Sequence, residues 1–267
     1  MEIIGYIMAL AIGISLGLIG GGGSILAVPV LAYLFSLDEK VATAYSLFIV
    51  GTTALVGSFR QHRSGKVDWR TAGVFGFPAI VGVWLTRHFI VPALPDVLFF
   101  AGSLEFTRRM AMFGVFAVLM ICAAWSMLSN KEHKSGTGNV GYNYPLILLE
   151  GLVIGVVTGF VGAGGGFLII PALVILANLE IRTAIGTSLM IIALKSLLGF
   201  FLGDAMTIAI DWLFLAQFTG LSIIGIFVGV YFGQFIDGER LRKGFGYFIV
   251  AMAVFVFTTE FINQMQS

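Results

Sequence analysis

The sequence contains little cysteine and little histidine, which limits the metal and redox chemistry open to it. Cys122 is the only cysteine among 267 residues, so neither an internal disulfide nor a cysteine metal cluster can form. His62, His88 and His133 lie far apart and show no metal-ligand spacing. We therefore expect no metal site.

Motifs for nucleotide binding and for hydrolysis are also missing. Gly65-Lys66 lacks the upstream glycine of a phosphate-binding loop, no HExxH sequence occurs, and Ser24 does not stand in a nucleophile elbow. The formal net charge of +1 gives no general attraction to nucleic acid. These absences predict a protein that is not an enzyme, has no cofactor and no built-in ATPase, and has no nucleic-acid partner.

Charged residues are scarce as well. Only 11% of the residues are charged and 58% are hydrophobic, and the mean hydropathy is +1.01, which leaves too little polar surface for a soluble globule. Apolar stretches of about twenty residues can each cross a bilayer as a helix. Such stretches lie at 41–59, 69–90, 110–129, 183–203, 209–235 and 243–262. The composition therefore predicts an all-α integral membrane protein that crosses the bilayer several times.

Nothing at the N-terminus resembles a signal peptide. The first apolar stretch has no basic region before it and no small-residue cleavage site after it, so we expect it to be mature sequence. No glycosylation sequon occurs. The missing sequon favours a bacterial plasma (inner) membrane.

Two glycine clusters interrupt long apolar stretches at 4–36 and 145–179. The first is Gly20-Gly21-Gly22-Gly23-Ser24, and the second is Gly162-Ala163-Gly164-Gly165-Gly166. Consecutive glycines do not continue a stable helix, and open backbone at membrane depth is tolerated only inside protein or beside a cavity. The clusters therefore predict two helix breaks that face a transported solute.

The two clusters belong to an internal repeat. When Pro29 is aligned with Pro171, residues 10–59 match residues 152–201 without a gap, and many glycines coincide. One inserted residue then aligns Trp69 with Trp212. We divide the chain into a first transmembrane repeat at 1–130, a polar cytoplasmic linker at 131–144 and a second transmembrane repeat at 145–267.

The orientation of the repeats depends on how the glycine-broken segments cross. If each segment is a single broken span, the repeats are parallel; if each is a re-entrant helical hairpin followed by three spans, the repeats are inverted. The positive-inside rule favours inversion, because it places ten Lys and Arg residues inside and four outside, against six and eight in the parallel arrangement. The four outside residues are then Lys40, Arg87, Arg108 and Arg109.

In the inverted arrangement the two glycine tips approach each other near the bilayer midplane. The helices that follow Gly23 and Gly165 would direct their free amides and positive dipole ends to this point, as helix ends do in small-anion sites. Ser24 could add a hydroxyl. The alternative is that the glycines only permit close helix packing, the role we assign to Gly225, Gly229 and Gly233.

Lys195 and a matched pair of serines complete the candidate site. Lys195 lies in the middle of a predicted span, where a cation is costly unless it faces a cavity or a partner; the alternative is that it extends along its stem to the surface. Its repeat partner is Thr53. Ser46 and Ser188 occupy equivalent positions on the helices after the breaks. The predicted anion-binding residues are Gly20, Gly21, Gly22, Gly23, Ser24, Ser46, Gly162, Ala163, Gly164, Gly165, Gly166, Ser188 and Lys195.

These motifs resemble the sulfite exporter TauE/SafE family, also described as four-toluene-sulfonate uptake permeases. The resemblance covers nearly the whole chain and rests on the residues Gly17 to Pro29, Ala42 to Leu47, Val67-Asp68-Trp69-Arg70, and the second copies at Gly159 to Pro171 and Ala184 to Leu189. The chain departs from a perfect repeat at Ala163, opposite Gly21, and at Thr86, opposite Gly229.

The resemblance implies a membrane permease that moves a small sulfur-containing anion such as sulfite, thiosulfate or an organosulfonate, commonly out of the cell. We expect alternating access, with protons as the candidate coupling ion and the lipid bilayer as the surroundings; the oligomeric state stays open. A passive anion channel and a membrane scaffold or assembly factor without transport are the alternatives.

Overall fold

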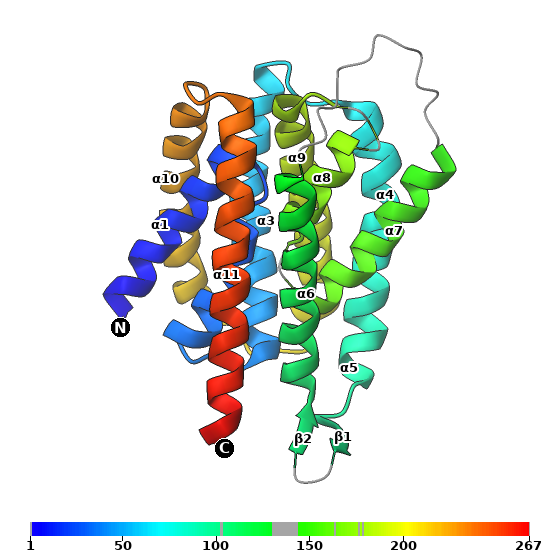
Figure 1. Ribbon diagram of the computed structural model, residues 1–267, viewed down its shortest axis with the longest axis vertical. Coiled ribbons are helices and arrows are strands. Elements are labelled where there is room, and N and C mark those ends of the chain that lie inside the picture. The colour runs from blue at the N-terminus through cyan, green and yellow to red at the C-terminus, as the bar shows by residue number, and fades with distance from the viewer. Residues whose placement is uncertain are drawn as a thin grey trace.

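The computed structural model describes residues 2–101, 104–129, 144–162, 164–175, 177 and 179–266. Most of these residues are helical, and the helices stand side by side in one bundle (Figure 1). The departure from the predicted all-α fold is a short antiparallel hairpin of β1 (Val97–Ala101) and β2 (Leu104–Thr107). The predicted linker at 131–144 lies outside the described residues except for Tyr144.

The first half of the chain forms the elements up to α6. The π-helical turns η1 and η2 each follow directly on the helix before them. The elements are α1 (Glu2–Ile19), α2 (Gly23–Pro29), η1 (Val30–Leu34), α3 (Glu39–Arg63), α4 (Trp69–Leu85), η2 (Thr86–Ile90), α5 (Val91–Ala93) and α6 (Arg108–Leu128).

The second half repeats the order of the main helices from α7 onward, while its π-helical turn follows a different helix and the short α5 and the hairpin have no counterpart among the described residues. Its elements are α7 (Tyr144–Val161), α8 (Gly166–Ile175), α9 (Ile181–Gly199), η3 (Phe200–Asp204), α10 (Trp212–Gly233) and α11 (Gly238–Gln266). Both helix breaks fall where the glycine clusters predict them, between α1 and α2 and between α7 and α8.

Five helical segments in the described part of the chain are long and apolar enough to cross a membrane. They confirm five of the six predicted spans: Glu39–Arg63, Trp69–Ala93, Arg108–Leu128, Ile181–Asp204 and Trp212–Gly233. The sixth predicted span, 243–262, falls within α11, whose described apolar segment is Gly246–Thr259. The chain is therefore built as a multi-pass membrane protein.

Aspartate side chains fix the starts of three long helices. Asp38 accepts a hydrogen bond from the Lys40 amide at the start of α3, and Asp68 accepts from the amide of Arg70 at the start of α4. Asp211, which the repeat aligns with Asp68, accepts from the amide of Phe214 in α10. These caps satisfy amides that have no partner inside their helix. The same local chemistry therefore sets the same helix start in both repeats.

The centre of the bundle is an antiparallel pair, α3 and α9. Gly51 of α3 lies against Leu197, and Leu47 lies near Gly199, whereas Gln61 at the far end of α3 lies near Gly186 at the start of α9. The two helices thus run in opposite directions. The buried apolar side chains of both helices belong to one hydrophobic core.

Glycines bring two outer helix pairs into backbone contact across the repeats. In the pair α1 and α10, a Cβ atom on Gly225 would collide with the carbonyl oxygen of Leu10, and one on Gly229 with that of Ile14. In the pair α4 and α7, Gly151 faces Phe75 and Gly155 faces Ala79 in the same way. The expected packing role is confirmed for Gly225 and Gly229, while Gly233 makes only ordinary contacts, 3.6 Å from Leu18.

The pairs interlock the two halves of the sequence. Helix α1 of the first repeat packs on α10 of the second, and α7 of the second packs on α4 of the first. Helices α6 and α11 pair with each other along one face of the bundle (Figure 1). Each half therefore completes its core with helices from the other half.

Two arginines that the topology count assigns to the outer face are buried. Arg108 donates to Glu39 at 2.6 Å and forms a second ion pair with Asp96 at 2.8 Å, which fastens the start of α6 to the start of α3. Arg87, in η2, pairs with Asp204, in η3, at 3.3 Å. Their charges therefore join elements of the bundle instead of lying in flanking loops.

A single methyl group tests the close packing of α1 against α10. Gly225→Ala should lower the melting temperature in detergent by roughly 3–10 °C, because its Cβ would displace the α1 backbone at a cost of about 1–3 kcal/mol. Gly220→Ala, on the same helix with nothing within 4 Å of its Cβ position, is the matched control. Size-exclusion-coupled fluorescence measures the two melting temperatures. Equal values for the two variants would contradict this contact.

Candidate functional site

The two glycine tips lie in contact with each other inside the bundle. A Cβ atom on Gly21 would overlap the backbone of Gly166, and one on Gly166 would overlap Gly21 in return. A Cβ on Gly164 would lie 3.3 Å from the Cβ of Ser24. Glycine clusters from the two repeats are thus brought together, as the sequence predicts, with their backbones close enough to exclude side chains.

The second tip has the more irregular backbone. Gly162, Gly164 and Gly165 have φ values of 71°, 64° and 65°, in the left-handed region that glycine tolerates best. In the first tip only Gly20, at 72°, has such a value. Ala163, which replaces a glycine of the first tip, lies outside the described residues. The two tips therefore differ in the backbone on either side of Ala163.

Each tip leads into the start of a helix. In the second tip Leu168 and Ile169 donate to the Gly165 carbonyl, and these are the earliest hydrogen bonds of α8 among the described residues. In the first tip the corresponding bonds begin at Ser24 and Ile25, which donate to Gly21 and Gly22. The start of a helix is the place where proteins commonly bind a small anion.

Lys195 points at the second tip from α9. Its side chain is buried, its Nζ donates to Thr158 Oγ1 at 2.6 Å, and a Cβ on Gly165 would lie 2.8 Å from the same Nζ. Within the described residues, no carboxylate forms an ion pair with Lys195. The lysine therefore does not extend to the surface. Among the described residues, the Thr158 hydroxyl is the hydrogen-bond partner of this buried ammonium group, which lies beside the irregular backbone of the second tip.

The serine hydroxyls differ from one another in their hydrogen bonds. Ser24 donates to the Gly21 carbonyl at 2.7 Å, and Ser188 donates to the Ile185 carbonyl at 2.8 Å, so both protons are used within their own chain segment. Ser188 Oγ also lies 2.9 Å from the Cβ position of Gly20. Ser46 Oγ is buried and has no hydrogen-bond partner among the described residues. Of the predicted hydroxyls, only that of Ser46 keeps an unused proton.

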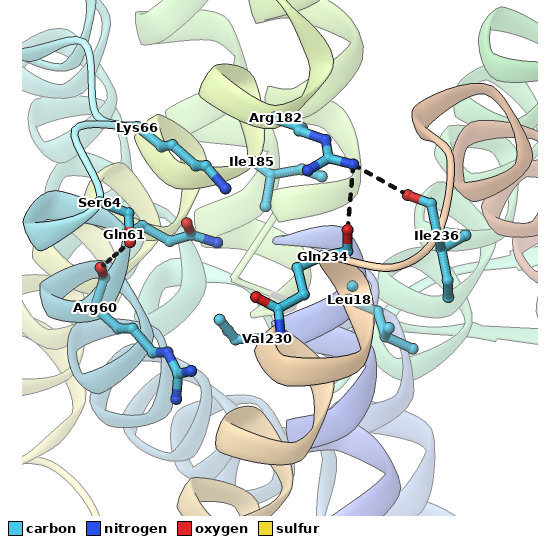
Figure 2. Close-up of a pocket in the computed structure, with 12 residues that line it drawn as sticks. Leu18, Arg60, Gln61, Ser64, Lys66, Arg182, Ile185, Val230, Gln234 and Ile236 are labelled. Carbon is cyan, nitrogen blue, oxygen red and sulfur yellow. Dashed lines mark hydrogen bonds between the residues drawn. The ribbon is translucent and has the colours of Figure 1, made fainter.

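A polar cavity of about 100 Å³ opens beside the first tip (Figure 2). Arg60, Lys66 and Arg182 bring three cationic side chains to its walls. The amino group of Lys66 and the amide of Gln61 point into the space, and Arg182 donates to the carbonyls of Gln234 and Ile236 (Figure 2). No acidic residue is among its lining residues, which also include Gly17, Leu18, Ser64, Ile185, Val230 and Gly233. The cavity thus presents positive charge to a solute.

Comparison with known protein families identifies the family of the chain. A family model described as Sulfite exporter TauE/SafE matches residues 6–256. The chain belongs to the TauE/SafE sulfite exporter family. The resemblance seen in the glycine motifs is therefore confirmed, and the chain is a membrane transporter by family.

Several relatives of this TauE/SafE protein are named probable membrane transporter proteins. One from Xylella fastidiosa is 28% identical over 251 residues, which cover 92% of this chain and 90% of the relative. YdhB from Bacillus subtilis is 25% identical over 234 residues, covering 87% and 90%, and MJ0441 from Methanocaldococcus jannaschii is 24% identical over 202 residues, covering 74% and 68%. No solved structure matches the chain.

One residue beside the tips of this TauE/SafE protein is missing from the sequence prediction. The Arg87 side chain is fully buried, and its Nη2 lies against the Cβ position of Gly162 in the second tip. Its Nη1 donates to Thr43 Oγ1 at 3.1 Å. A sequence signal does exist, because the repeat aligns Arg87 with the apolar Val230 inside a span. That alignment places Arg87 in the bundle, whereas its position at the end of an apolar run suggests a loop.

The packing of the second tip can be tested with a matched pair of glycines. Gly165 and Gly65 have φ values of 65° and 68°, but a Cβ on Gly165 would collide with Thr158, whereas nothing lies within 4 Å of one on Gly65. Gly65→Ala should cost only the backbone strain, about 1–2 kcal/mol. Gly165→Ala should lose more, and thermal unfolding in detergent measures the difference. Equal losses would show that the second tip tolerates a side chain.

Proposed function

We propose that this TauE/SafE protein transports a small sulfur-containing anion, such as sulfite, thiosulfate or an organosulfonate, and binds it between the two glycine tips. The observation that carries the proposal is the buried Lys195 ammonium, 2.6 Å from Thr158 Oγ1 and next to Gly165, without a carboxylate partner in the described residues. A buried cation of this kind is costly unless an anion or a cavity compensates it. The substrate would supply the missing negative charge.

The amides of the tips provide the rest of the proposed site. In the proposed site the tips separate enough to admit the anion, and because Gly21 and Gly166 carry no side chains its oxygen atoms can then approach the start of α8 directly. Ser46 Oγ, which has no hydrogen-bond partner among the described residues, adds a donor on α3. Three oxygens around one sulfur, as in sulfite or a sulfonate, match a site in which donors converge from several sides.

The proposed mechanism uses two inverted repeats. The antiparallel packing of α3 on α9, which are equivalent helices of the two repeats, supports inversion, as does the reciprocal packing of α1 on α10 and α7 on α4. Rocking of one repeat against the other would expose the tips to each side in turn. The cavity with Arg60, Lys66 and Arg182 would be the entrance on the cytoplasmic side, consistent with the positive-inside rule.

The family description suggests the direction and the location. Export across a bacterial plasma membrane, with protons as the candidate coupling ion, fits a sulfite exporter family and the cationic entrance on the cytoplasmic side. A cationic vestibule raises the local concentration of an anion and so speeds its capture.

Counterflow of labelled sulfite into proteoliposomes preloaded with unlabelled sulfite tests the proposal. We expect transient accumulation of the label, with inhibition by thiosulfate and sulfoacetate and little effect of chloride. A passive channel would give flux without counterflow. Folded protein that moves none of these anions would favour the scaffold alternative and overturn the proposal.

Replacing Lys195 tests the charge in the site. Lys195→Ala should weaken sulfite binding at least 10-fold, about 1.4 kcal/mol. Because the substitution also removes a buried side chain and its hydrogen bond to Thr158, binding is compared only on protein that elutes as a single folded peak. Lys243→Ala, which removes an exposed lysine paired with Glu239 on α11, is the control and should bind normally. Unchanged affinity of Lys195→Ala in a binding titration would remove Lys195 from the site.

A further inference from the structure

The two ends of the bundle are built alike but differ in what fills them. At the end with the cationic cavity, Gly17, Ile185 and Val230 line open space. The repeat aligns these residues with Gly159, Thr43 and Arg87 at the other end. The equivalent of the small apolar Val230 is thus the long side chain of Arg87.

Arg87 fills its end of the bundle completely. Its side chain has no exposed surface, its Cβ lies 2.7 Å from the Cβ position of Gly203, and its Nη2 lies against that of Gly162. Glycine at both neighbouring positions makes room for it. The Arg87 guanidinium therefore lies between the second tip and η3, where the other end of the molecule has a cavity.

The partners of Arg87 hold it only in part. Nη1 contacts Asp204 Oδ1 at 3.3 Å and Thr43 Oγ1 at 3.1 Å, while Nε, Nη2 and Asp204 Oδ2 are buried without hydrogen-bond partners among the described residues. A buried ion pair is favourable only when its remaining donors and acceptors are also satisfied. Arg87 thus keeps two donors for another anion, and one of them faces the tip.

We propose that the Arg87–Asp204 ion pair is the gate that closes the η3 end of the transport path, and that Arg87 exchanges Asp204 for the substrate anion when this end opens. The exchange rests on the proposed function, whereas the gate does not. The cation stays paired throughout, with a protein carboxylate in the closed state and with a sulfur oxyanion in the open one. Asp204 lies at the end of the span that contains Lys195, so movement of that span moves one half of the gate.

Thiol accessibility behind the gate tests this proposal without reference to the substrate. In a Cys122→Ser background, Ser46→Cys places a thiol one helical turn deeper than Thr43 on α3, where Ser46 is buried. A membrane-impermeant, positively charged methanethiosulfonate is added to right-side-out and to inside-out vesicles. Labelling is scored only on protein that elutes as a single folded peak.

Removing the gate should speed labelling at least 5-fold, and in only one vesicle orientation. Asp204→Asn removes the ion pair but leaves Arg87 unpaired, so the double variant Arg87→Gln with Asp204→Asn is tested beside it, because it leaves no lone charge. Glu39→Gln is the matched control: it breaks a buried ion pair at the same end, with Arg108, yet Arg108 keeps Asp96. Labelling with Glu39→Gln should match that of the intact gate.

The outcomes separate the gate from the substrate. Unchanged labelling in both gate variants, or an equal rise with Glu39→Gln, overturns the gate even if sulfite counterflow is observed. Faster labelling together with no counterflow of any sulfur anion supports the gate and overturns the proposed substrate. Slowing of thiol labelling by sulfite only when Arg87 is present supports the exchange. Slowing by sulfite that persists in the double variant overturns the exchange.

Discussion

The close contact of two glycine tips is the constraint on which the rest of the structure depends. Backbone that leaves a helix inside a membrane protein needs either protein or a polar cavity around it. Gly21 and Gly166 meet the first condition by touching each other, and this contact is possible only without side chains. The antiparallel pair α3 and α9 then surrounds the tips, because Gly20 lies against Ile185 and Gly162 against Thr43.

Close packing of the outer helices follows from the same need. Each tip must be held at one depth in the bundle. The helix that leads into each tip packs on a helix of the opposite repeat, α1 on α10 and α7 on α4. Glycines at Gly225 and Gly155 make these contacts backbone to backbone. In a bilayer, where apolar burial gives little drive for association, such contacts supply much of the packing energy. Each tip is therefore tied to both halves of the chain.

The helical fold and the place of both tips could be predicted from the sequence. Apolar length located the spans, glycine clusters located both breaks and so the tips, and the position of a cation in the middle of a span singled out Lys195. Arg87 could not be found in this way, because its partner Asp204 is far away in sequence and its position at the end of an apolar run looks like a loop. Nor could the sequence show that Ser24 and Ser188 donate to their own backbone while Ser46 does not.

The backbone follows the repeat, but the charge does not. Lys195 stands opposite Thr53 and Arg87 opposite Val230 in the repeat. These two buried cations lie beside the second tip, one at Gly165 and one at Gly162. Among the described residues, Asp204 pairs with Arg87 and no carboxylate pairs with Lys195, so this region has more basic than acidic side chains. In the proposed carrier with inverted repeats, this asymmetric charge would make the two conformations unequal in energy until an anion neutralises the excess. An anion bound here would therefore change the relative stability of the two states, which is what a substrate must do to drive the proposed cycle.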